Sequence, residues 1–294
     1  MTQSTISPVF PFESKYQDVH GSRMHYVEVG DPDADPILFL HGNPTSVYLW
    51  RNIMPYLAEQ GRCIAVDLIG MGKSDKPDLP YRFHDHVKYL EGFIEALALK
   101  NITLVIHDWG SGLGFNYWAR HQGNVKGIAF MESILAAEGP RPLQFRMLFA
   151  VMRTPGLGWL MISVFNAFIN QLLQGAIVRQ LSPQEMAHYR APYPTIASRK
   201  PVRQWPLEVP IDGAPADVSR EVEAYTKALQ ESDVPKLLLY AQPGFLITEQ
   251  NRPFILNNFP NLTAVDIGKG LHYVQEDNPH GTGEAISAWY STLS

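Results

Sequence analysis

Asp108 lies where an apolar, β-branched run, Ile102 to Ile106, gives way to small residues that begin at Gly110. The run is typical of a strand buried on both faces, and the small residues suit a helix packed closely on a sheet. A sharp turn between the two would lift its central side chain above the sheet. An aspartate is ionised at neutral pH, because its reference pKa is about 4, so it needs no base to attack a carbon atom. We therefore predict that Asp108 is a nucleophile.

Two further residues could serve a reaction at Asp108. Glu132 follows the apolar run 125–131, and His272 follows two glycines after the apolar run 262–267. Loops at the carboxyl ends of parallel strands meet at one edge of a sheet, so these side chains are expected to lie near Asp108. The order nucleophile, acid, histidine along the chain is also that of the α/β-hydrolase triad. Asp108, Glu132 and His272 are thus candidates for such a triad.

The elements that must position these residues can be predicted from apolar periodicity and turn residues. The expected strands are two in a hairpin over residues 15–29, which turns at Gly21-Ser22, and one each over residues 37–40, 63–66, 102–106, 125–131, 236–240 and 262–267. The expected helices run from a Ser46 cap towards Gln60, over His84–Leu99, after Gly110, near 219–231 and 249–258, and up to Leu293. This alternation predicts an α/β fold with a mostly parallel sheet and helices on both faces.

Residues 134–212 break the alternation. This segment is helical in pattern and rich in aromatic residues, and it is predicted to form a cap inserted into a core of residues 1–133 and 213–294. Its most apolar stretch, 156–165, has about half the length that a membrane-spanning helix needs. We therefore predict a helical lid and no membrane segment.

The composition limits the partners and the location of the protein. A net charge of -5 with dispersed Lys and Arg argues against a nucleic-acid surface and favours a small, uncharged ligand. The single cysteine, Cys63, excludes an intramolecular disulfide and is predicted to pack in the core. The first eight residues lack the basic and apolar regions of a signal peptide, so we expect a cytoplasmic protein.

Five motifs of the chain together carry a family resemblance: HGNPTS at 41–46, LWRNIMP at 49–55, DLIGMG at 67–72, HDWGS at 107–111 and GLHYVQED at 270–277. Through them the chain resembles the haloalkane dehalogenases of the α/β-hydrolase superfamily. The resemblance covers almost the whole sequence and is loosest between about residues 136 and 160. It implies an α/β-hydrolase fold, in which an eight-stranded, mostly parallel sheet is flanked by helices and carries an inserted helical cap.

The resemblance also implies roles for individual residues. Asp108 is expected to be the nucleophile, His272 the base and Glu132 its acidic partner, with Asn43 and Trp109 binding the halide. No metal and no organic cofactor are implied, and the partners are a small halogenated hydrocarbon, water and a halide ion. Further residues are expected to line the cavity or its tunnel: Phe168, Ala176, Phe245, Leu246 and Leu271. Phe145 and Phe149 could instead belong to the core of the lid.

Two features depart from the general pattern. The elbow has Ile106 where the motif G-x-nucleophile-x-G has a small residue. In this family the acid follows either the strand ending at Met131 or a later strand, and the later site here, residues 242–247, contains no carboxylate. Glu132 is therefore the better candidate for the acid.

These residue types suit a two-step displacement. Asp108 would displace the halide from a tetrahedral carbon and form an ester, and water deprotonated by His272 would hydrolyse that ester. Trp109 and Asn43 offer neutral N–H donors to the departing halide, and their backbone N–H groups would hold the oxyanion. His107 is expected to point away from the site, and His41 to shape its own loop.

Three other functions compete with this one. An epoxide hydrolase also has this fold and an aspartate nucleophile, but it needs acidic donors such as two lid tyrosines, for which Tyr189 and Tyr193 are the candidates. A cofactor-free luciferase-type oxygenase is the second alternative. The third, a binding protein or hormone receptor on the same fold, is disfavoured by an intact triad. The sequence leaves open whether the protein is a monomer or a homo-oligomer.

Overall fold

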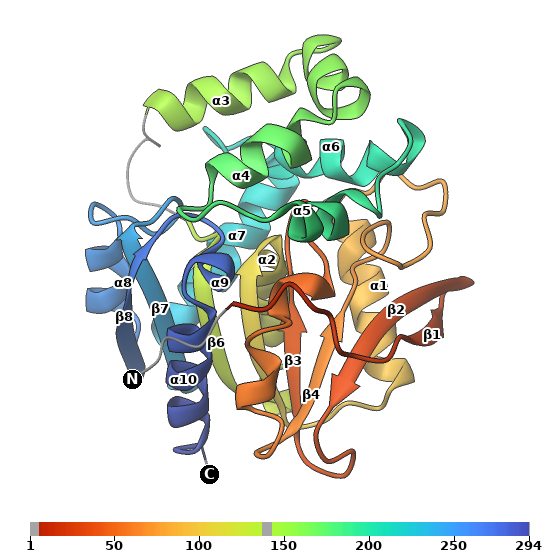
Figure 1. Ribbon diagram of the computed structural model, residues 1–294. Helices are drawn as coiled ribbons and strands as arrows, with labels where there is room; N and C mark the ends of the chain where they lie inside the picture. Colours follow the sequence, from red (N-terminus) through yellow and green to blue (C-terminus); the bar gives the residue numbers. More distant parts are fainter. Residues whose placement is uncertain (1–5, 137–142, 294) are drawn as a thin grey trace.

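The computed structural model describes residues 6–136 and 143–293 and has one eight-stranded sheet at its centre (Figure 1). Residues 1–5, part of the segment without signal-peptide features, and 137–142, inside the predicted cap, lie outside the described residues. In spatial order the strands are β1 (Lys15–Val19), β2 (Ser22–Val29), β4 (Arg62–Val66), β3 (Pro36–Leu40), β5 (Ile102–Asp108), β6 (Val125–Ser133), β7 (Lys236–Pro243) and β8 (Leu262–Gly270). Only the pairs β1–β2 and β2–β4 are antiparallel. The predicted hairpin and the mostly parallel eight-stranded sheet are therefore confirmed.

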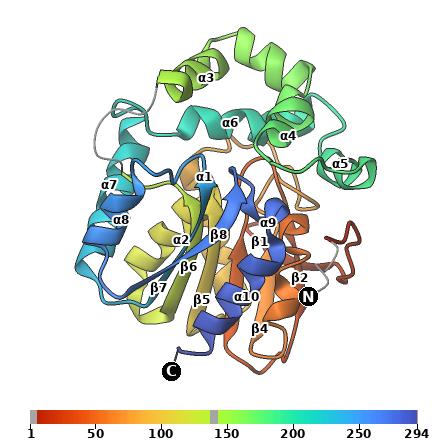
Figure 2. The same ribbon diagram turned by 60° about the vertical axis from the view of Figure 1, so that its left-hand side comes forward.

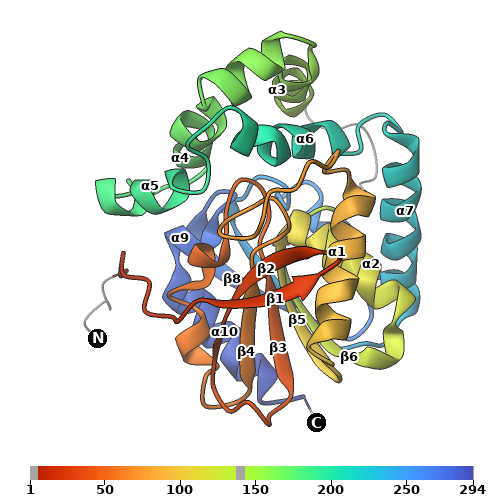
Figure 3. The ribbon, with the colours of Figure 1, turned by 90° about the vertical axis from the view of Figure 1, so that its right-hand side faces the viewer.

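Helices cover both faces of this sheet, each over its own apolar core. One face carries α1 (Phe83–Ala96), α2 (Trp109–Arg120), α7 (Ala216–Glu231) and α8 (Arg252–Asn258), with the short turn η3 (Gln122–Asn124) after α2. The other face carries α9 (Val274–Asp277) and α10 (Pro279–Tyr290), and Figure 3 shows these on the opposite side of the sheet from α1, α2 and α7. Cys63 is fully buried in this second core as a free thiol, which agrees with its predicted packing role.

The helix predicted from Ser46 towards Gln60 is wrong. Ser46 does cap a helical turn, because its Oγ accepts from the backbone N–H of Tyr48. The segment then forms two short 3-10 turns, η1 (Val47–Trp50) and η2 (Met54–Tyr56), in place of one α-helix. Pro55 explains the interruption, since it has no N–H to donate and its ring would clash with the carbonyl four residues earlier.

The described residues between β6 and α7 form a layer of helices above the carboxyl ends of the strands (Figure 2). These helices are α3 (Leu143–Arg153), the π-helical turns η4 (Trp159–Val164) and η5 (Phe168–Leu172), α4 (Leu173–Gly175), α5 (Pro183–Arg190), η6 (Ala197–Arg199) and α6 (Lys200–Glu208). Throughout the part of the chain that the structure describes, no helix is long and apolar enough to cross a membrane. The division into core and cap at residues 134 and 212 stays a prediction.

A buried ionic network fastens this helical layer to the core. The Arg51 guanidinium donates to both carboxylate oxygens of Glu276, at 2.6 and 2.8 Å, and to Glu185 of α5 at 2.9 Å. Arg179 also donates to both glutamates, so two cations face two anions. Because the charges are paired and nearly all buried, removal of one partner leaves an uncompensated charge in the interior.

We expect the substitution Arg51→Met to lower the free energy of unfolding by about 3–5 kcal/mol, the range for breaking a buried ion pair. Urea denaturation followed by circular dichroism measures this difference. Arg146 is the matched control, because its ion pair with Asp212 is largely exposed and its replacement by Met should cost less than about 1 kcal/mol. Equal, small losses in both variants would contradict a stabilising role for the network.

Candidate active site

Asp108 sits on a strained turn between β5 and α2. Its backbone φ is +50°, a left-handed conformation that is uncommon for a residue other than glycine. The small residue missing from the elbow at Ile106 is supplied by the following helix, because a Cβ added to Gly114 would come within 2.8 Å of the Ile106 side chain. Gly114 of α2 thus allows the helix to pack closely on β5, although Ile106 is not a small residue.

The Asp108 carboxylate is held by the loop after β3 and by a histidine. The backbone N–H of Asn43 donates to Oδ1 at 2.7 Å, and His272 Nε2 lies 3.2 Å from Oδ2. Gly42 permits this approach, since a Cβ there would lie 2.0 Å from Oδ1. Burial alone would raise the pKa of Asp108, but the hydrogen bond and charge of His272 outweigh it and hold the pKa below its usual value. Asp108 is therefore anionic at neutral pH.

His272 lies between two carboxylates. Its Nε2 faces Asp108, and its Nδ1 lies 3.3 Å from Oε2 of Glu132. Burial would lower the pKa of His272, but the hydrogen bonds and charges of both carboxylates raise it to about 9. The loop that carries the histidine is tied to the helical layer, because the backbone N–H groups of His272 and Tyr273 both donate to the carbonyl of Ala176.

Glu132 is oriented by backbone N–H groups. It lies at the end of β6 with a φ of +42°, and its carboxylate accepts from Phe245 at 3.1 Å, Leu246 at 2.6 Å and Ile247 at 3.3 Å. These donors belong to the loop after β7, which is the alternative position for the acid in the family's pattern. That loop therefore holds the carboxylate of Glu132 instead of supplying one.

His107 does not line the cavity above Asp108, in agreement with the prediction that it points away from the site, but it contacts the loop that carries His272. Its Nε2–H donates to the backbone carbonyl of His272 at 2.8 Å, and the two imidazole rings lie 4.7 Å apart. Burial and the neighbouring His272 lower the pKa of His107 to about 3, so its ring is neutral. The alternation of side chains along a strand predicts the direction of His107, but not its contact with the loop after β8. His41 does shape its loop, through hydrogen bonds to Gly42 and Leu68.

Trp109 and Asn43 both face the cavity above Asp108. The indole N–H of Trp109 donates to no acceptor among the residues that the structure describes. The Nδ2 of Asn43 donates to the carbonyl of Val202 at 3.1 Å, which occupies one of its two N–H bonds and leaves the other. Two neutral donors therefore adjoin an ionised carboxylate.

The cavity has a volume of about 280 Å³ and an apolar wall. The five residues predicted to line it do so, and Phe145 and Phe149 also line it, contrary to the alternative that they belong only to the lid core. The lining residues that the sequence did not single out are Ile134, Leu148, Met152, Gln171, Leu172, Gly175, Pro206, Val209 and Tyr273. No lysine or arginine lies among the described lining residues, so no side-chain cation there is available to a leaving anion.

The two lid tyrosines lie away from this cavity. Tyr189 is buried and donates to Glu276, within the network that fastens α5. Tyr193 is also buried and is absent from the cavity wall. The cavity does contain Tyr273, but its hydroxyl donates to the backbone carbonyl of Asn43 at 2.8 Å. The pair of acidic donors expected of an epoxide hydrolase is thus not assembled by these tyrosines.

Among the described residues there is no group of three or more His, Cys, Asp or Glu side chains that could hold a metal ion.

Comparisons with known proteins point to one family. The profile of the family described as "alpha/beta hydrolase fold" matches residues 35–279. A haloalkane dehalogenase of Mesorhizobium japonicum is 45% identical over 91% of this chain and 88% of its own, and one of Sphingobium indicum is 46% identical over 96% and 97%. The crystal structure of a haloalkane dehalogenase from Bradyrhizobium elkani superimposes with a TM-score of 0.93 at 43% identity, covering 96% of this chain and 98% of the other.

Proposed function

The chain belongs to the haloalkane dehalogenases, hydrolases of the α/β-hydrolase fold, and from that premise we propose how its own residues cleave the carbon–halogen bond. Asp108 is the nucleophile, His272 and Glu132 activate water, and Asn43 and Trp109 hold the halide. The observation that carries this proposal is the pairing of an ionised carboxylate with two neutral N–H donors in one apolar cavity. The products are a primary alcohol and a halide ion.

In the first step, a carboxylate oxygen of Asp108 attacks the carbon that bears the halogen, and the carbon–halogen bond breaks as the ester bond forms. Negative charge moves from Asp108 to the departing halide, so donors near the leaving group stabilise the transition state. Trp109 and the second N–H of Asn43 are suited to this role, because neither has a lone pair on the donor nitrogen that repels an anion. Neutral donors also release the product halide more readily than a lysine would.

In the second step, water attacks the carbonyl carbon of the Asp108 ester and loses a proton to His272. The bond from this carbon to the oxygen that carries the alkyl group then breaks, and that oxygen takes the proton from His272 and leaves as the alcohol. Alkylation removes the charge of Asp108, one of the two carboxylates that raise the pKa of His272. The pKa of His272 therefore falls when the ester forms, and Nε2 becomes able to accept a proton while Nδ1–H still faces Glu132. The backbone N–H of Asn43, already on Oδ1, holds the oxyanion that develops there.

The two steps should differ in their pH dependence. Ester formation needs anionic Asp108, whose pKa is lowered, so its rate should stay constant from about pH 5 upward. Ester hydrolysis needs neutral His272, whose pKa in the ester is raised by Glu132 without the Asp108 charge, so its rate should fall about tenfold per pH unit below that pKa. Rapid-quench measurements with 1-bromobutane at pH 5 and pH 8 separate the steps. A burst of bromide that disappears at pH 5 would contradict this assignment.

Replacing Trp109 with Phe removes one N–H donor and keeps an aromatic ring. We expect kcat/KM for bromoalkanes to fall by about 10²–10³-fold, the usual effect of losing one donor to developing charge. Trp118→Phe is the matched control, because Trp118 is buried on the same helix, α2, and does not line the cavity. If Trp109→Phe and Trp118→Phe retain equal activity, Trp109 does not stabilise the leaving halide.

A substrate panel tests the proposed function itself. Halide release from short 1-bromoalkanes is measured by a halide-selective electrode, and diol formation from styrene oxide is measured in parallel. The proposal expects halide and no diol. Diol from styrene oxide with no halide from any bromoalkane would establish an epoxide hydrolase instead.

A further inference from the structure

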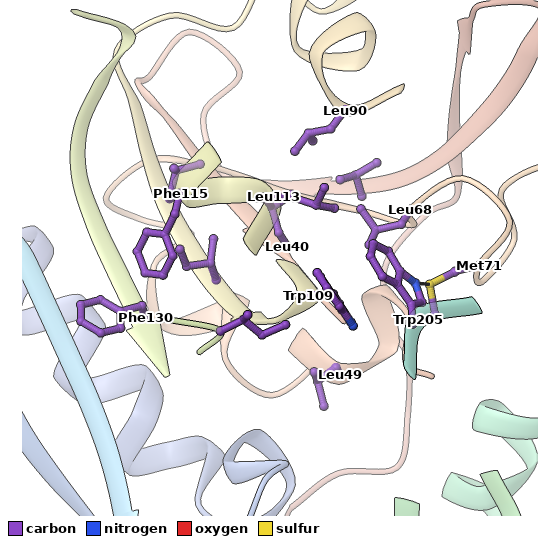
Figure 4. Packing of buried hydrophobic residues seen from close by; sticks show 14 of the residues in the cluster. Leu40, Leu49, Leu68, Met71, Leu90, Trp109, Leu113, Phe115, Phe130 and Trp205 are labelled. Atoms are coloured by element: carbon purple, nitrogen blue, oxygen red, sulfur yellow. Dashed lines mark hydrogen bonds between the residues drawn. The ribbon is translucent and has the colours of Figure 1, made fainter. Parts of the chain in front are cut away.

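One short helix of the cap, α6, contacts both proposed halide donors. The carbonyl of Val202 in this helix accepts the Nδ2–H of Asn43 at 3.1 Å. Three residues later, the Trp205 ring stacks on the Trp109 indole, with centroids 4.5 Å apart and planes at 25° (Figure 4). Asn43 comes from the loop after β3 and Trp109 is the first residue of α2, so α6 is a shared contact of two separate segments of the core.

Trp205 is suited to hold a ring and not to bind an anion itself. Its own N–H points at the sulfur of Met71, 3.3 Å away, as Figure 4 shows. Its other face stacks on the imidazole of His86, with centroids 4.1 Å apart and planes at 26°. Burial lowers the pKa of His86 to about 3, so the stack brings no positive charge towards the halide. His86, Trp205 and Trp109 thus form a neutral column that ends at the indole N–H.

The helix is itself fixed to the core near its end. The carboxylate of Glu208 is buried, and it accepts from Arg82 Nε at 2.7 Å and from the backbone N–H of Phe83 at 3.1 Å. Phe83 is the first residue of α1, and its ring lies beside that of Trp109, with centroids 5.9 Å apart and planes at 48°. The first residue of α1, Phe83, therefore contacts both the end of α6, through Glu208, and the proposed halide donor Trp109.

We propose that α6 sets the halide affinity of the site, with Trp205 as the positioning residue for Trp109 and the Val202 carbonyl as the group that orients the Asn43 amide. The proposal rests on the halide role proposed above for Trp109 and Asn43. An indole N–H stabilises a departing anion only when it is aimed at it, and the stack restricts the rotation of the ring. The carbonyl of Val202 likewise determines that the amide presents its remaining N–H, and not its oxygen, to the cavity.

The experiment compares Trp205→Phe with Trp289→Phe, a change of the same kind on α10 in the other core cluster. Bromide is titrated against the fluorescence of each folded protein. Quenching of Trp109 by bound bromide saturates, whereas quenching of the exposed Trp159 is linear in bromide, so the saturable part gives Kd. Pre-steady-state kinetics with 1-bromobutane give the rates of ester formation and ester hydrolysis separately.

For Trp205→Phe we expect the bromide Kd to rise roughly three- to tenfold and ester formation to slow by a similar factor, as expected for a lost aromatic stack. Ester hydrolysis should stay unchanged, because Trp205 contacts Trp109 and is absent from the cavity wall that includes His272. A structural defect alone would slow both steps. The Trp289→Phe control should match the unaltered protein in all three quantities.

Two results would overturn the inference. An unchanged bromide Kd in folded Trp205→Phe refutes the positioning role while leaving the proposed function intact. If Trp205→Phe does not fold, the bromide Kd is measured for Arg82→Gln instead. Arg82 is partly exposed, and its replacement removes the ion pair with Glu208 that holds the end of α6. An unchanged bromide Kd there also refutes the proposal. The proposed function fails separately, when the unaltered protein shows no saturable bromide signal and releases no halide.

Discussion

The substitution Asp108→Asn should abolish halide release from every bromoalkane, with a loss of at least about 10⁴-fold in kcat/KM. An asparagine amide has nearly the shape of the carboxylate and tolerates the positive φ of the elbow, but it carries no negative charge for attack on carbon. The backbone N–H of Asn43 can still donate to the amide oxygen, so the fold of the site is retained. Halide release at substrate concentrations well below KM measures the effect.

The same variant has a second readout that does not depend on turnover. With one of its two carboxylates neutralised, His272 should lose much of the elevation of its pKa, which lies at about 9. Titration of the imidazole by NMR follows this shift. If folded Asp108→Asn releases halide at the original rate, water or another residue performs the displacement, and the assignment of the nucleophile is wrong.

The substitution His272→Phe should stop ester hydrolysis but still allow ester formation at about pH 8, where Asp108 stays anionic without the charge of His272 that lowers its pKa. We expect one halide per protein chain in a burst, followed by turnover reduced by at least about 10³-fold, since no base remains to activate water. Phenylalanine is close in size to histidine, and the residue is buried between Asp108 and Phe245, so the cavity keeps its walls. Mass spectrometry of the protein after incubation with 1-bromobutane should show the mass of one butyl group on Asp108.

A surface histidine provides the control for this experiment. His121 is well exposed and lies at the end of α2, away from the cavity, so His121→Phe should turn over normally and accumulate no ester. If Asp108 stays unmodified in the His272→Phe variant after exposure to the bromoalkane, the reaction does not proceed through an ester on Asp108. A modified Asp108 in the His121 variant would show that hydrolysis is slow for another reason.

The regular elements of the core could be predicted because their residues repeat with a period. The eight strands and most helices lie within a few residues of their predicted positions, since buried parallel strands are continuous apolar runs bounded by turn residues. The segment after Ser46 could not be predicted in this way. Its apolar residues suit a helix, but the local effect of Pro55 replaces that helix by two 3-10 turns.

The proposed triad residues could be singled out because each lies at or just after the end of a strand, at the carboxyl edge of one sheet. His272 does lie within hydrogen-bond distance of both Asp108 and Glu132. The hydrogen bonds that orient these residues could not be predicted, because they depend on loops whose sequences have no periodic pattern. The three N–H donors to Glu132 and the hydrogen bond from His107 are of this kind.

The cap was the hardest part to predict in detail. Its aromatic residues indicate a lid, but their spacing does not predict which of them face the cavity and which face other helices. Phe145 and Phe149 line the cavity, whereas Trp205 stacks behind Trp109 and is absent from the cavity wall. Trp205 belongs to none of the family motifs, so its contact with Trp109 becomes apparent only in the folded structure.

Isotope transfer in a single turnover tests the central claim, that Asp108 forms an ester with the substrate carbon. Protein in excess over 1-bromobutane is allowed one turnover in H₂¹⁸O, and both the alcohol and the peptide that contains Asp108 are analysed by mass spectrometry. Because water attacks the carbonyl carbon of the ester, the ¹⁸O should enter the Asp108 carboxylate and the first butanol should contain ¹⁶O. Butanol labelled with ¹⁸O and an unlabelled Asp108 would mean that water displaces the halide directly, which contradicts the mechanism.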